Sequence, residues 1–441
     1  MKWVLGTIVL LAAGLIFKLG SLVYGMYVVL GVLLVSRYLA RVWTGHLSAT
    51  RWTDGDSVRI GESVQVEVTV LNLGRWRVPW VLLEDSLPLQ ALRQHPPRIR
   101  VEGQSLLLAQ LPARGQKTLA YEVRFLMRGY YQFGPLLLES GDLFGLHRRY
   151  RVITSPSCVL VYPKVVPLEG YDIASRRPIG EVRLSHRLFE DPTRIAGVRA
   201  YERGDPLNRI HWRATARTGS LQSKLYEPSC IAGATIVLNF HEGGFGLKNP
   251  VYRQELAITT AASLANAVYQ MGEQIGLLTN GRDAAERIRY EGRHQEFRTR
   301  AIARAKAAEL ERSQRLQPVQ VETRRGATQL EQILATLARL ESTNGFEFPQ
   351  LLAASTGRLA RDATVIAVLA DVSEETAIAL GNLKRNGFAV TAVLVLYGET
   401  DYYDWAQPPE WAARLLAEGI DFRRVDDEPA LSRLCAERIL R

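Results

Sequence analysis

Hydrophobic side chains fill residues 3–36 almost without interruption, apart from Lys18. The apolar runs on either side of that lysine, residues 3–17 and 19–35, are each slightly shorter than the roughly 20 residues that cross a bilayer as a helix. A tight helical hairpin with Lys18 snorkelling at its turn accommodates both runs. We therefore predict a transmembrane helical hairpin over residues 1–41.

The charges beside this hairpin predict its orientation. Lys2 precedes it, and Arg37, Arg41 and Arg51 follow it. By the positive-inside rule both flanks lie in the cytoplasm, so the bulk of the chain would be cytoplasmic and attached to the inner (cytoplasmic) membrane. A single long tilted helix is the alternative, and it would place that bulk outside. A signal peptide fits less well, because the apolar stretch continues past Lys18.

Residues 55–165 change to a pattern typical of strands. Apolar and polar side chains alternate with a period of two over residues 63–71, as in a half-buried strand. Similar short runs occupy residues 78–84, 117–125, 130–138 and 157–162. Strands at this spacing predict an immunoglobulin-like β-sandwich. Within it, residues 128–131 and 142–146 are interpreted as specific corners rather than as chemistry.

From residue 231 onward, buried strands alternate with amphipathic helices. This order predicts a parallel, doubly wound α/β sheet over residues 231–441, in which ligands bind beyond the carboxyl ends of the strands. The predicted strands are residues 234–240, 274–279, 365–370 and 389–396. The predicted helices are residues 254–269, 296–316, 326–341, 374–386, 408–417 and 429–440.

Residues 166–230 join these two regions and contain a motif that predicts a helix. In Gly204-Asp205-Pro206, the aspartate can cap the free amides of a helix and the proline suits its first position. The helix would run over residues 207–217 and end at Gly219 in the left-handed conformation.

Arginines line one side of this predicted helix, because Arg209, Arg213 and Arg217 are spaced four residues apart. An apolar side is formed by Leu207, Ile210 and Ala214. An arginine cluster binds anions such as partner carboxylates, phosphates or lipid head groups. Alternatively, the arginines pair with the chain's own carboxylates and fix a junction between domains. The candidate partner-binding residues are Arg199, Tyr201, Arg203, Asp205, Arg209, Trp212, Arg213 and Arg217.

Composition narrows the function classes. The 441 residues carry a net charge of +10, which is too diffuse to indicate nucleic-acid binding but permits an anionic membrane or an acidic partner. The three cysteines, Cys158, Cys230 and Cys435, are too widely spaced for a disulfide scaffold or a metal knuckle. The sequence has no Walker loop, dinucleotide fingerprint, His-Glu-x-x-His motif or nucleophile elbow. We therefore expect no cofactor and no enzymatic activity.

The strand ends of the α/β region resemble those of the von Willebrand factor A domain. That family holds Mg²⁺ with an Asp-x-Ser-x-Ser loop after its first strand. Here Asn239, His241 and Gly243 stand at the three positions, so the carboxylate and both hydroxyls are missing. The resemblance therefore implies a degenerate site without a metal. Asp371, after a later strand, is either a remaining ligand or the N-cap of the next helix, helped by Ser373.

One long motif reads Arg199-x-Tyr201-x-x-Gly204-Asp205-Pro206-x-x-x-Ile210-x-Trp212-x-Ala214-x-Ala216-Arg217, followed by Leu221 and preceded by Asp142-Leu143-Phe144-Gly145-Leu146. By this motif the chain resembles, over nearly its whole length, the bacterial "domain of unknown function 58" family. The resemblance implies a two-helix anchor, a β-rich region and a von Willebrand A-like domain. It also implies a partnership with a MoxR-type AAA+ ATPase in the assembly or maturation of other proteins.

These observations lead to a non-enzymatic, membrane-anchored scaffold as the expected function. The alternative is an envelope-associated hydrolase with a site at the strand ends, near His241, Glu242 and Asp371. A third hypothesis is an anion- or lipid-sensing module that uses the basic residues 296–316. The identity of any partner or client and the oligomeric state are not specified by these patterns.

Overall fold

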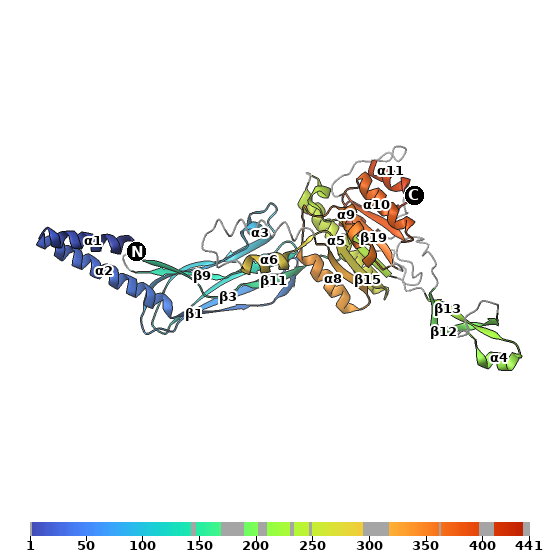
Figure 1. Cartoon of the computed structure of the whole chain (residues 1–441), viewed down its shortest axis with the longest axis horizontal. Helices are drawn as coiled ribbons and strands as arrows, with labels where there is room; N and C mark the ends of the chain where they lie inside the picture. The colour runs from blue at the N-terminus through green and yellow to red at the C-terminus, as the bar shows by residue number, and fades with distance from the viewer. Residues whose placement is uncertain are drawn as a thin grey trace. The chain divides into compact units, whose positions relative to one another are not determined.

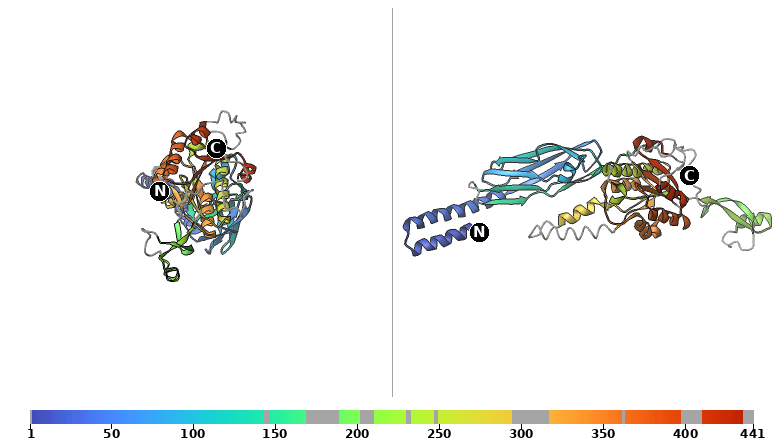
Figure 2. Two further views of the ribbon diagram at one scale, coloured as in Figure 1. Left: turned by 90° about the vertical axis from the view of Figure 1, so that its right-hand side faces the viewer. Right: turned by 90° about the horizontal axis from the view of Figure 1, so that it is seen from above.

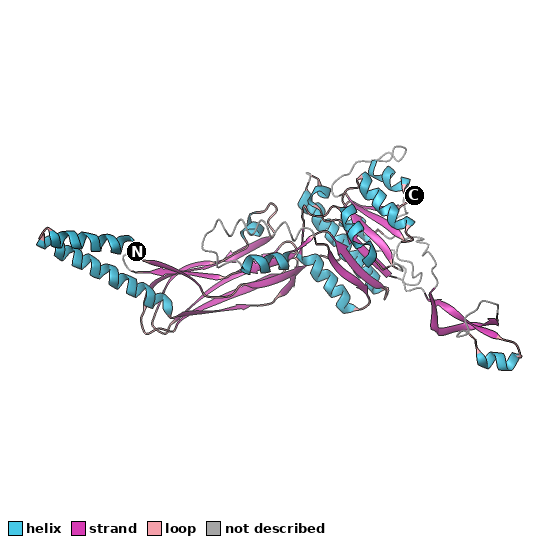
Figure 3. Cartoon of the chain, in the orientation of Figure 1, coloured by secondary structure: helices cyan, strands magenta, loops and turns pink. Residues whose placement is uncertain are grey.

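The computed structural model describes residues 2–142, 147–168, 189–201, 210–229, 233–246, 249–293, 317–360, 363–396 and 410–434. The chain divides into two compact units, Met1–Pro163 and Lys164–Arg441. The first contains an N-terminal pair of helices and a β-rich fold, and the second contains an α/β sheet (Figure 1, Figure 3).

The N-terminal helices α1 (Lys2–Ile16) and α2 (Gly20–Gly45) lie antiparallel, side by side (Figure 1, Figure 2). Lys18 lies in the turn between them with a φ of 55°, as expected for the hairpin. Gly14 allows a close approach, since a Cβ there would lie 2.7 Å from the Leu22 side chain. In the part of the chain that the structure describes, α2 is the one helix long and apolar enough to cross a bilayer, and α1 adds a shorter apolar segment.

The last third of α2 belongs to the β-rich fold. Trp43 packs in its hydrophobic core, and Ser36, Ala40 and Thr44 are buried. The Ser36 hydroxyl lies 3.0 Å from His147 Nδ1, and Arg151 donates to the backbone carbonyl of Thr44. Helix α2 therefore continues from its exposed apolar segment into the folded core without a linker.

Three sheets surround this core. The first, in the order β1-β3-β7-β5, is formed by Leu47–Thr53, Ser63–Asn72, Gln116–Phe125 and Ile99–Gly103. The second, in the order β10-β9-β4-β6, is formed by Arg148–Val152, Leu136–Gly141, Val78–Asp85 and Leu106–Leu111. The third, in the order β2-β11-β8, is formed by Ser57–Arg59, Ser157–Tyr162 and Gly129–Phe133. A short helix α3 (Leu89–Arg93) also lies in this unit.

The alternating pattern predicted β3, β4, β7 and β11, whereas β1, β2, β5, β6 and β10 were not predicted and one predicted run needs a correction. In β3 the residues Val64, Val66, Val68 and Val70 are buried and their neighbours are more exposed. The run predicted over residues 130–138 is instead two strands, β8 and β9, divided at Gly134-Pro135. Proline has no N–H to donate to a sheet, which explains the break.

A buried polar triad crosses the core of this unit. Arg51 forms an ion pair with Asp85, with side chains 6% and 0% exposed, and the Tyr121 hydroxyl donates to the second carboxylate oxygen at 2.6 Å. Burial raises the pKa of the Asp85 carboxyl, although the hydrogen bond from Tyr121 and the charge of Arg51 act in the opposite direction. The environment as a whole therefore disfavours the charged carboxylate.

Residues 128–131 form a corner of the β-rich fold, as predicted. The Tyr131 hydroxyl donates to the carbonyls of Met127 and Arg128, each at 3.0 Å. A tyrosine that bonds back to the chain a few residues upstream is a known corner device in β-sandwiches. The other predicted corner, at residues 142–146, lies outside the described residues beyond Asp142.

The second unit is built on a six-stranded sheet in the order β17-β15-β14-β19-β20-β21. Its strands, in chain order, are β14 (Gly233–Leu238), β15 (Gln274–Thr279), β17 (Val319–Arg324), β19 (Thr364–Leu369), β20 (Val390–Val395) and β21 (Asp421–Val425). All neighbouring strands are parallel except β17, which is antiparallel to β15. The parallel sheet that we predicted is thus present, with an antiparallel edge strand added.

Helices cover both faces of this sheet (Figure 3). One core contains Ile236 and Leu238 of β14, and the other contains Val237, as expected for a strand buried on both sides. The first core is completed by α5 (Pro250–Gln270), α8 (Ala327–Arg339) and α12 (Glu428–Ser432). The second is completed by α9 (Phe348–Ser355), α10 (Glu374–Arg385) and α11 (Glu410–Ala417).

Three predicted helices need comment. The helix predicted over residues 429–440 already ends at Ser432 in α12, and Arg433 is its C-cap. The helix predicted over residues 326–341 ends at Arg339, because β18 (Leu340–Glu341) pairs with β16 (Arg282–Asp283), just before α6 (Ala284–Arg293). The basic helix predicted over residues 296–316 lies outside the described residues.

Candidate functional site

The strand order of the α/β sheet reverses between β14 and β19, and this is where open α/β sheets bind ligands. Asn239 and His241 follow β14, and Asp371 follows β19. The Asn239 N–H donates to the carbonyl of Val368 at 3.0 Å, so the first of these loops is fixed against β19. The predicted residues therefore lie on loops at one edge of the sheet.

Two buried asparagines organise this edge. Asn280, 1% exposed, donates through Nδ2 to Asn239 Oδ1 at 3.0 Å and to the Phe346 carbonyl at 2.8 Å. Its Oδ1 accepts the N–H of Phe240 at 2.6 Å. Asn239 Oδ1 also receives the N–H of His241 at 3.3 Å. Asn239 Oδ1 therefore serves as an acceptor for structural hydrogen bonds.

His241 also has a structural role. Its Nδ1 accepts the N–H of Gly243 at 3.1 Å and caps the short helix η2 (Glu242–Phe245). Its backbone forms a bridge with Thr343, whose carbonyl accepts the N–H of Glu242. Among the residues that the structure describes, no group of three or more His, Cys, Asp or Glu side chains is placed to hold a metal ion.

Asp371 is not the N-cap of the following helix. Its carboxylate accepts the N–H of the adjacent Val372 at 2.8 Å, and Ser373 caps α10 by accepting the N–H of Thr376 at 3.2 Å. The cap falls on Ser373 because it is the residue directly before the helix and has an extended backbone. The pKa of Glu375, in the first turn of α10, is lowered by its own backbone N–H and then by the Ser373 hydroxyl.

A buried arginine that the sequence did not single out joins the two loops. Arg253 on α5 is 7% exposed and donates to the carbonyl of Phe245 at 3.0 Å and to that of Ala370 at 2.9 Å. One guanidinium thus connects η2 with the loop after β19. In the sequence Arg253 is one of two charged residues on an Ala-rich helix, the other being Glu255, and this alone does not indicate a role.

Replacing Asn280 with alanine should lower the unfolding free energy of the α/β unit by about 1–3 kcal/mol, because it leaves the buried N–H of Phe240 without its acceptor. Thermal unfolding of the full chain measures this. The control is Asn382→Ala at an exposed site on α10, which should change stability by no more than about 0.5 kcal/mol. Equal effects of the two substitutions would contradict a structural role for Asn280.

The junction segment forms an antiparallel strand pair with a short helix. The strands are β12 (Phe189–Ala200) and β13 (Gln222–Ser229), and the helix is α4 (Trp212–Thr218). Gly219 ends the helix with a φ of 68°, as predicted.

The predicted start of this helix is wrong. Ile210 is buried and forms a bridge with Ser223, and His211 is the N-cap, with Nδ1 accepting the N–H of Ala214 at 3.0 Å. Pairing with β13 therefore holds Ile210 outside the helix. The predicted row of three arginines is reduced to Arg213 and Arg217. The other predicted residues Arg203, Asp205 and Arg209 lie outside the described residues.

The surface of α4 is exposed. None of its residues is buried, Trp212 is 68% exposed, and Arg213 and Arg217 both face solvent. Of the remaining predicted residues, Arg199 lies on β12 and donates to the carbonyl of Ala200 at 3.3 Å, and Tyr201 directly follows β12 and donates its N–H to the Leu221 carbonyl. The segment thus offers an aromatic and two cationic side chains at its surface.

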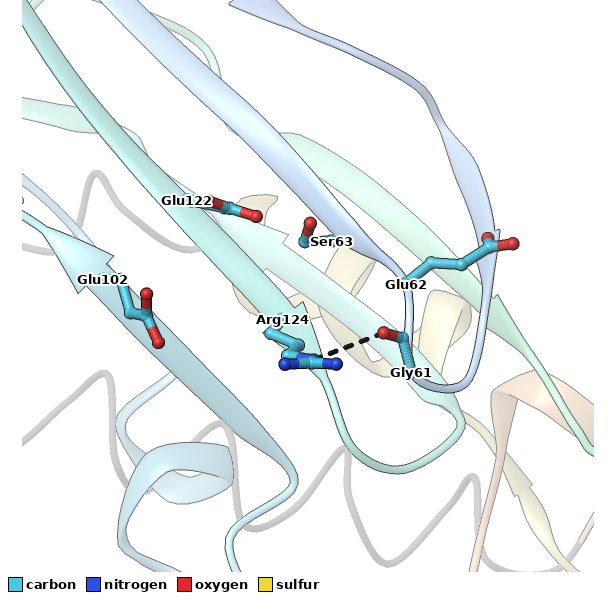
Figure 4. A pocket seen from close by; sticks show the side chains of 6 residues that line it. All are labelled: Gly61, Glu62, Ser63, Glu102, Glu122 and Arg124. Atoms are coloured by element: carbon cyan, nitrogen blue, oxygen red, sulfur yellow. Dashed lines mark hydrogen bonds between the residues drawn. The ribbon is translucent and has the colours of Figure 1, made fainter.

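A separate pocket of about 510 Å³ lies on the β-rich unit (Figure 4). Glu102 and Glu122 are paired neighbours on the adjacent strands β5 and β7, and Arg124 Nε donates to the Gly61 carbonyl at 3.4 Å. The Glu62 carboxylate is held by the N–H of Arg59 at 2.7 Å. This charged hollow was not predicted, because the register that brings its strands together has no local signal.

Comparisons with known proteins find a family match that begins in the junction segment and extends into the α/β unit. Residues 197–348 match the family described as protein of unknown function DUF58. The uncharacterized protein YeaD of Bacillus subtilis (strain 168) is 23% identical over 262 residues, which are 58% of this chain and 62% of the relative. The match therefore spans less than two thirds of that relative's length.

Likenesses to solved structures are weak. The CARDB domain of a Pyrococcus furiosus protein in complex with di-metal ions is 17% identical, covers 26% of this chain and 86% of its own, and has a TM-score of 0.18. Proximal thread matrix protein 1 from the mussel byssus is 12% identical, covers 46% of each chain, and has a TM-score of 0.28. Scores of this size do not establish a shared fold.

Proposed function

We propose, from the premise that the chain belongs to the DUF58 family, that it is a non-enzymatic, membrane-anchored scaffold for protein assembly or maturation. Its partner would be a MoxR-type AAA+ ATPase, as the family resemblance implies. Client proteins would be presented to that ATPase at the membrane.

The exposed surface of α4 carries this proposal. It lies inside the family-matched segment and presents Trp212, Arg213 and Arg217 on a helix that buries none of its residues. Tryptophan and arginine are enriched among the residues that contribute most to protein–protein binding. An exposed tryptophan between a buried bridge and two exposed arginine side chains has no evident role in packing.

A membrane anchor is supported by the N-terminal hairpin. Helix α2 is long and apolar enough to cross a bilayer, and its exposed residues include Leu34 and Val35. Lys2, Arg37 and Arg41 flank the apolar segments, which favours the inner membrane with both flanks in the cytoplasm. A single crossing by α2 remains the alternative topology.

A degenerate von Willebrand A-like domain is our interpretation of the α/β unit. Its doubly wound sheet with an antiparallel edge strand is consistent with that fold. The hydrogen bonds that occupy Asn239 and His241 support a site that has exchanged cation binding for loop structure. The geometry gives little support to the hydrolase alternative, because His241 and Asp371 each accept a hydrogen bond from a backbone N–H of their own loop.

The α4 surface is tested by the triple substitution Trp212→Ala, Arg213→Glu and Arg217→Glu. We expect recovery of the AAA+ ATPase with the full chain, after crosslinking in native membranes, to fall by more than about tenfold. The protein should remain folded, because all three side chains are exposed.

The chain offers a matched control in Arg75-Trp76-Arg77, where Trp76 is 69% exposed against 68% for Trp212. The substitutions Arg75→Glu, Trp76→Ala and Arg77→Glu change the same residue types on the other unit and should leave recovery unchanged. Undiminished recovery with the α4 variant would reject this surface as the binding site.

A further inference from the structure

An exposed, arginine-rich strand lies beside the helix proposed to cross the membrane. All five residues of β10, from Arg148 to Val152, are exposed. The sequence Arg-Arg-Tyr-Arg-Val contains no acidic residue, and it forms the edge of its sheet. An edge strand with this charge is protected from pairing with other strands, but its position suggests a second role.

Two contacts fix β10 against α2. His147, just before the strand, lies 3.0 Å from the Ser36 hydroxyl through its Nδ1. Arg151 donates to the carbonyls of Thr44 and Gly45 at the end of α2. The strand therefore runs beside residues 36–45 of the helix, and its first residues lie level with the point where the exposed apolar segment of α2 ends.

Helix α2 adds its own arginines at this level. Arg41 is exposed and Arg37 is half-buried, one turn apart, and residues 36–46 contain no acidic side chain. We call Arg37, Arg41, Arg148 and Arg149 the basic collar. Arg151 is left out of it because its guanidinium is used against α2. Of the collar, Arg148 is partly neutralised by Glu139 at 3.2 Å.

Aromatic residues accompany these charges. Tyr38 on α2 is 65% exposed and Tyr150 on β10 is 70% exposed. Tyrosine is enriched where a protein passes from hydrocarbon to head groups, and arginines next to a membrane segment attract anionic lipids. Exposed apolar, aromatic and cationic side chains thus follow one another along the same end of the unit.

We propose that the basic collar binds the head groups of anionic phospholipids, with β10 as a second row of cations behind those of α2. The proposal rests on the anchoring of α2 in the membrane. It goes beyond that anchoring, because residues more than a hundred positions away in the sequence supply half of the collar. The lipid phosphate is the anion that this position and this charge would meet.

The test uses the full chain in detergent micelles, titrated with phosphatidylglycerol or with phosphatidylcholine and observed by native mass spectrometry. Wild-type protein should retain phosphatidylglycerol preferentially, and less of it as salt is raised. The variant Arg37→Gln, Arg41→Gln, Arg149→Gln should lower the affinity for phosphatidylglycerol on the order of tenfold to a hundredfold.

The control variant is Arg59→Gln, Arg100→Gln, Arg124→Gln, which removes the same charge from exposed arginines elsewhere on the unit. Arg124 pairs with Ser63 at the start of β3, whereas Asn72 at its other end pairs with Leu47, next to α2. The ten residues of β3 separate the two ends by about 30 Å. The control should retain phosphatidylglycerol as wild type does.

Two outcomes would reject lipid binding by the basic collar without bearing on the membrane anchor. These are equal retention of both lipids by the wild type, or unchanged retention of phosphatidylglycerol by the collar variant. Extraction of membranes with alkaline carbonate distinguishes this failure from that of the anchor. A chain released by carbonate would reject the membrane anchor and with it the collar. A chain that stays in the membrane but shows no lipid preference would reject the collar alone.

Discussion

Replacing Asp85 with alanine should lower the unfolding free energy of the β-rich unit by about 3–5 kcal/mol, because Arg51 is then buried without its counter-charge. The Tyr121 hydroxyl loses its acceptor in the same variant. Hydrogen exchange of peptides from β4 and β7 in the full chain measures the change, and these peptides should exchange at least about a hundredfold faster.

A triple replacement separates charge from packing. Burial outweighs Tyr121 and Arg51 in its effect on the pKa of Asp85. The free-energy cost of desolvating the triad is therefore larger than the stabilisation from its internal contacts. The variant Arg51→Met, Asp85→Leu, Tyr121→Phe should therefore recover most of the stability that Asp85→Ala loses. If it is as unstable as the single variant, an uncompensated charge is not the cause of the loss.

Replacing Arg253 with methionine should lower the stability of the loops at the carboxyl ends of β14 and β19 by about 3–5 kcal/mol. The substitution removes two charge-assisted hydrogen bonds, to the carbonyls of Phe245 and Ala370, from a buried site. Hydrogen exchange of η2 and of the segment after β19 should accelerate more than that of β20.

The control for this prediction is Arg253→Lys, which keeps the charge. A lysine presents a single ammonium group and lacks the planar fork that reaches both carbonyls, so it should restore only part of the protection. Full protection in the methionine variant would mean that α5 and the loops are held by apolar packing alone.

Local patterns predicted the elements whose burial alternates regularly. The valines of β3 and the strands β14, β15 and β19 are found within a residue or two of the predicted ranges, because their side chains face a core directly. The strands β17 and β21 were missed. Their sequences, Val-Gln-Val-Glu-Thr-Arg and Asp-Phe-Arg-Arg-Val, carry enough charge to resemble loops.

Tertiary pairing explains the main error. Gly204-Asp205-Pro206 has the chemistry of a helix start, but the helix begins at Trp212 because Ile210 pairs with Ser223. A capping rule considers only neighbours along the chain, so it cannot foresee a strand that arrives later in the sequence.

The sequence predicted which loops form the candidate site, but not the hydrogen bonds that connect them. The order of strands and helices placed Asn239, His241 and Asp371 at one edge of the sheet. Asn280 and Arg253 were missed as organisers, because they act on backbone carbonyls and amides that no sequence pattern marks. The same is true of the Asp85 triad, whose members are brought together only by strand register.

The continuity of α2 has a mechanical consequence. At 1.5 Å per residue, its segment from Ser36 to Gly45 rises about 15 Å while packed against the sheets. With α2 in the bilayer as proposed, the β-rich unit is a rigid extension of its anchor and not a domain on a tether. A force that the proposed ATPase applies to that unit would then be transmitted directly to the helix pair in the membrane, because no flexible linker lies between them.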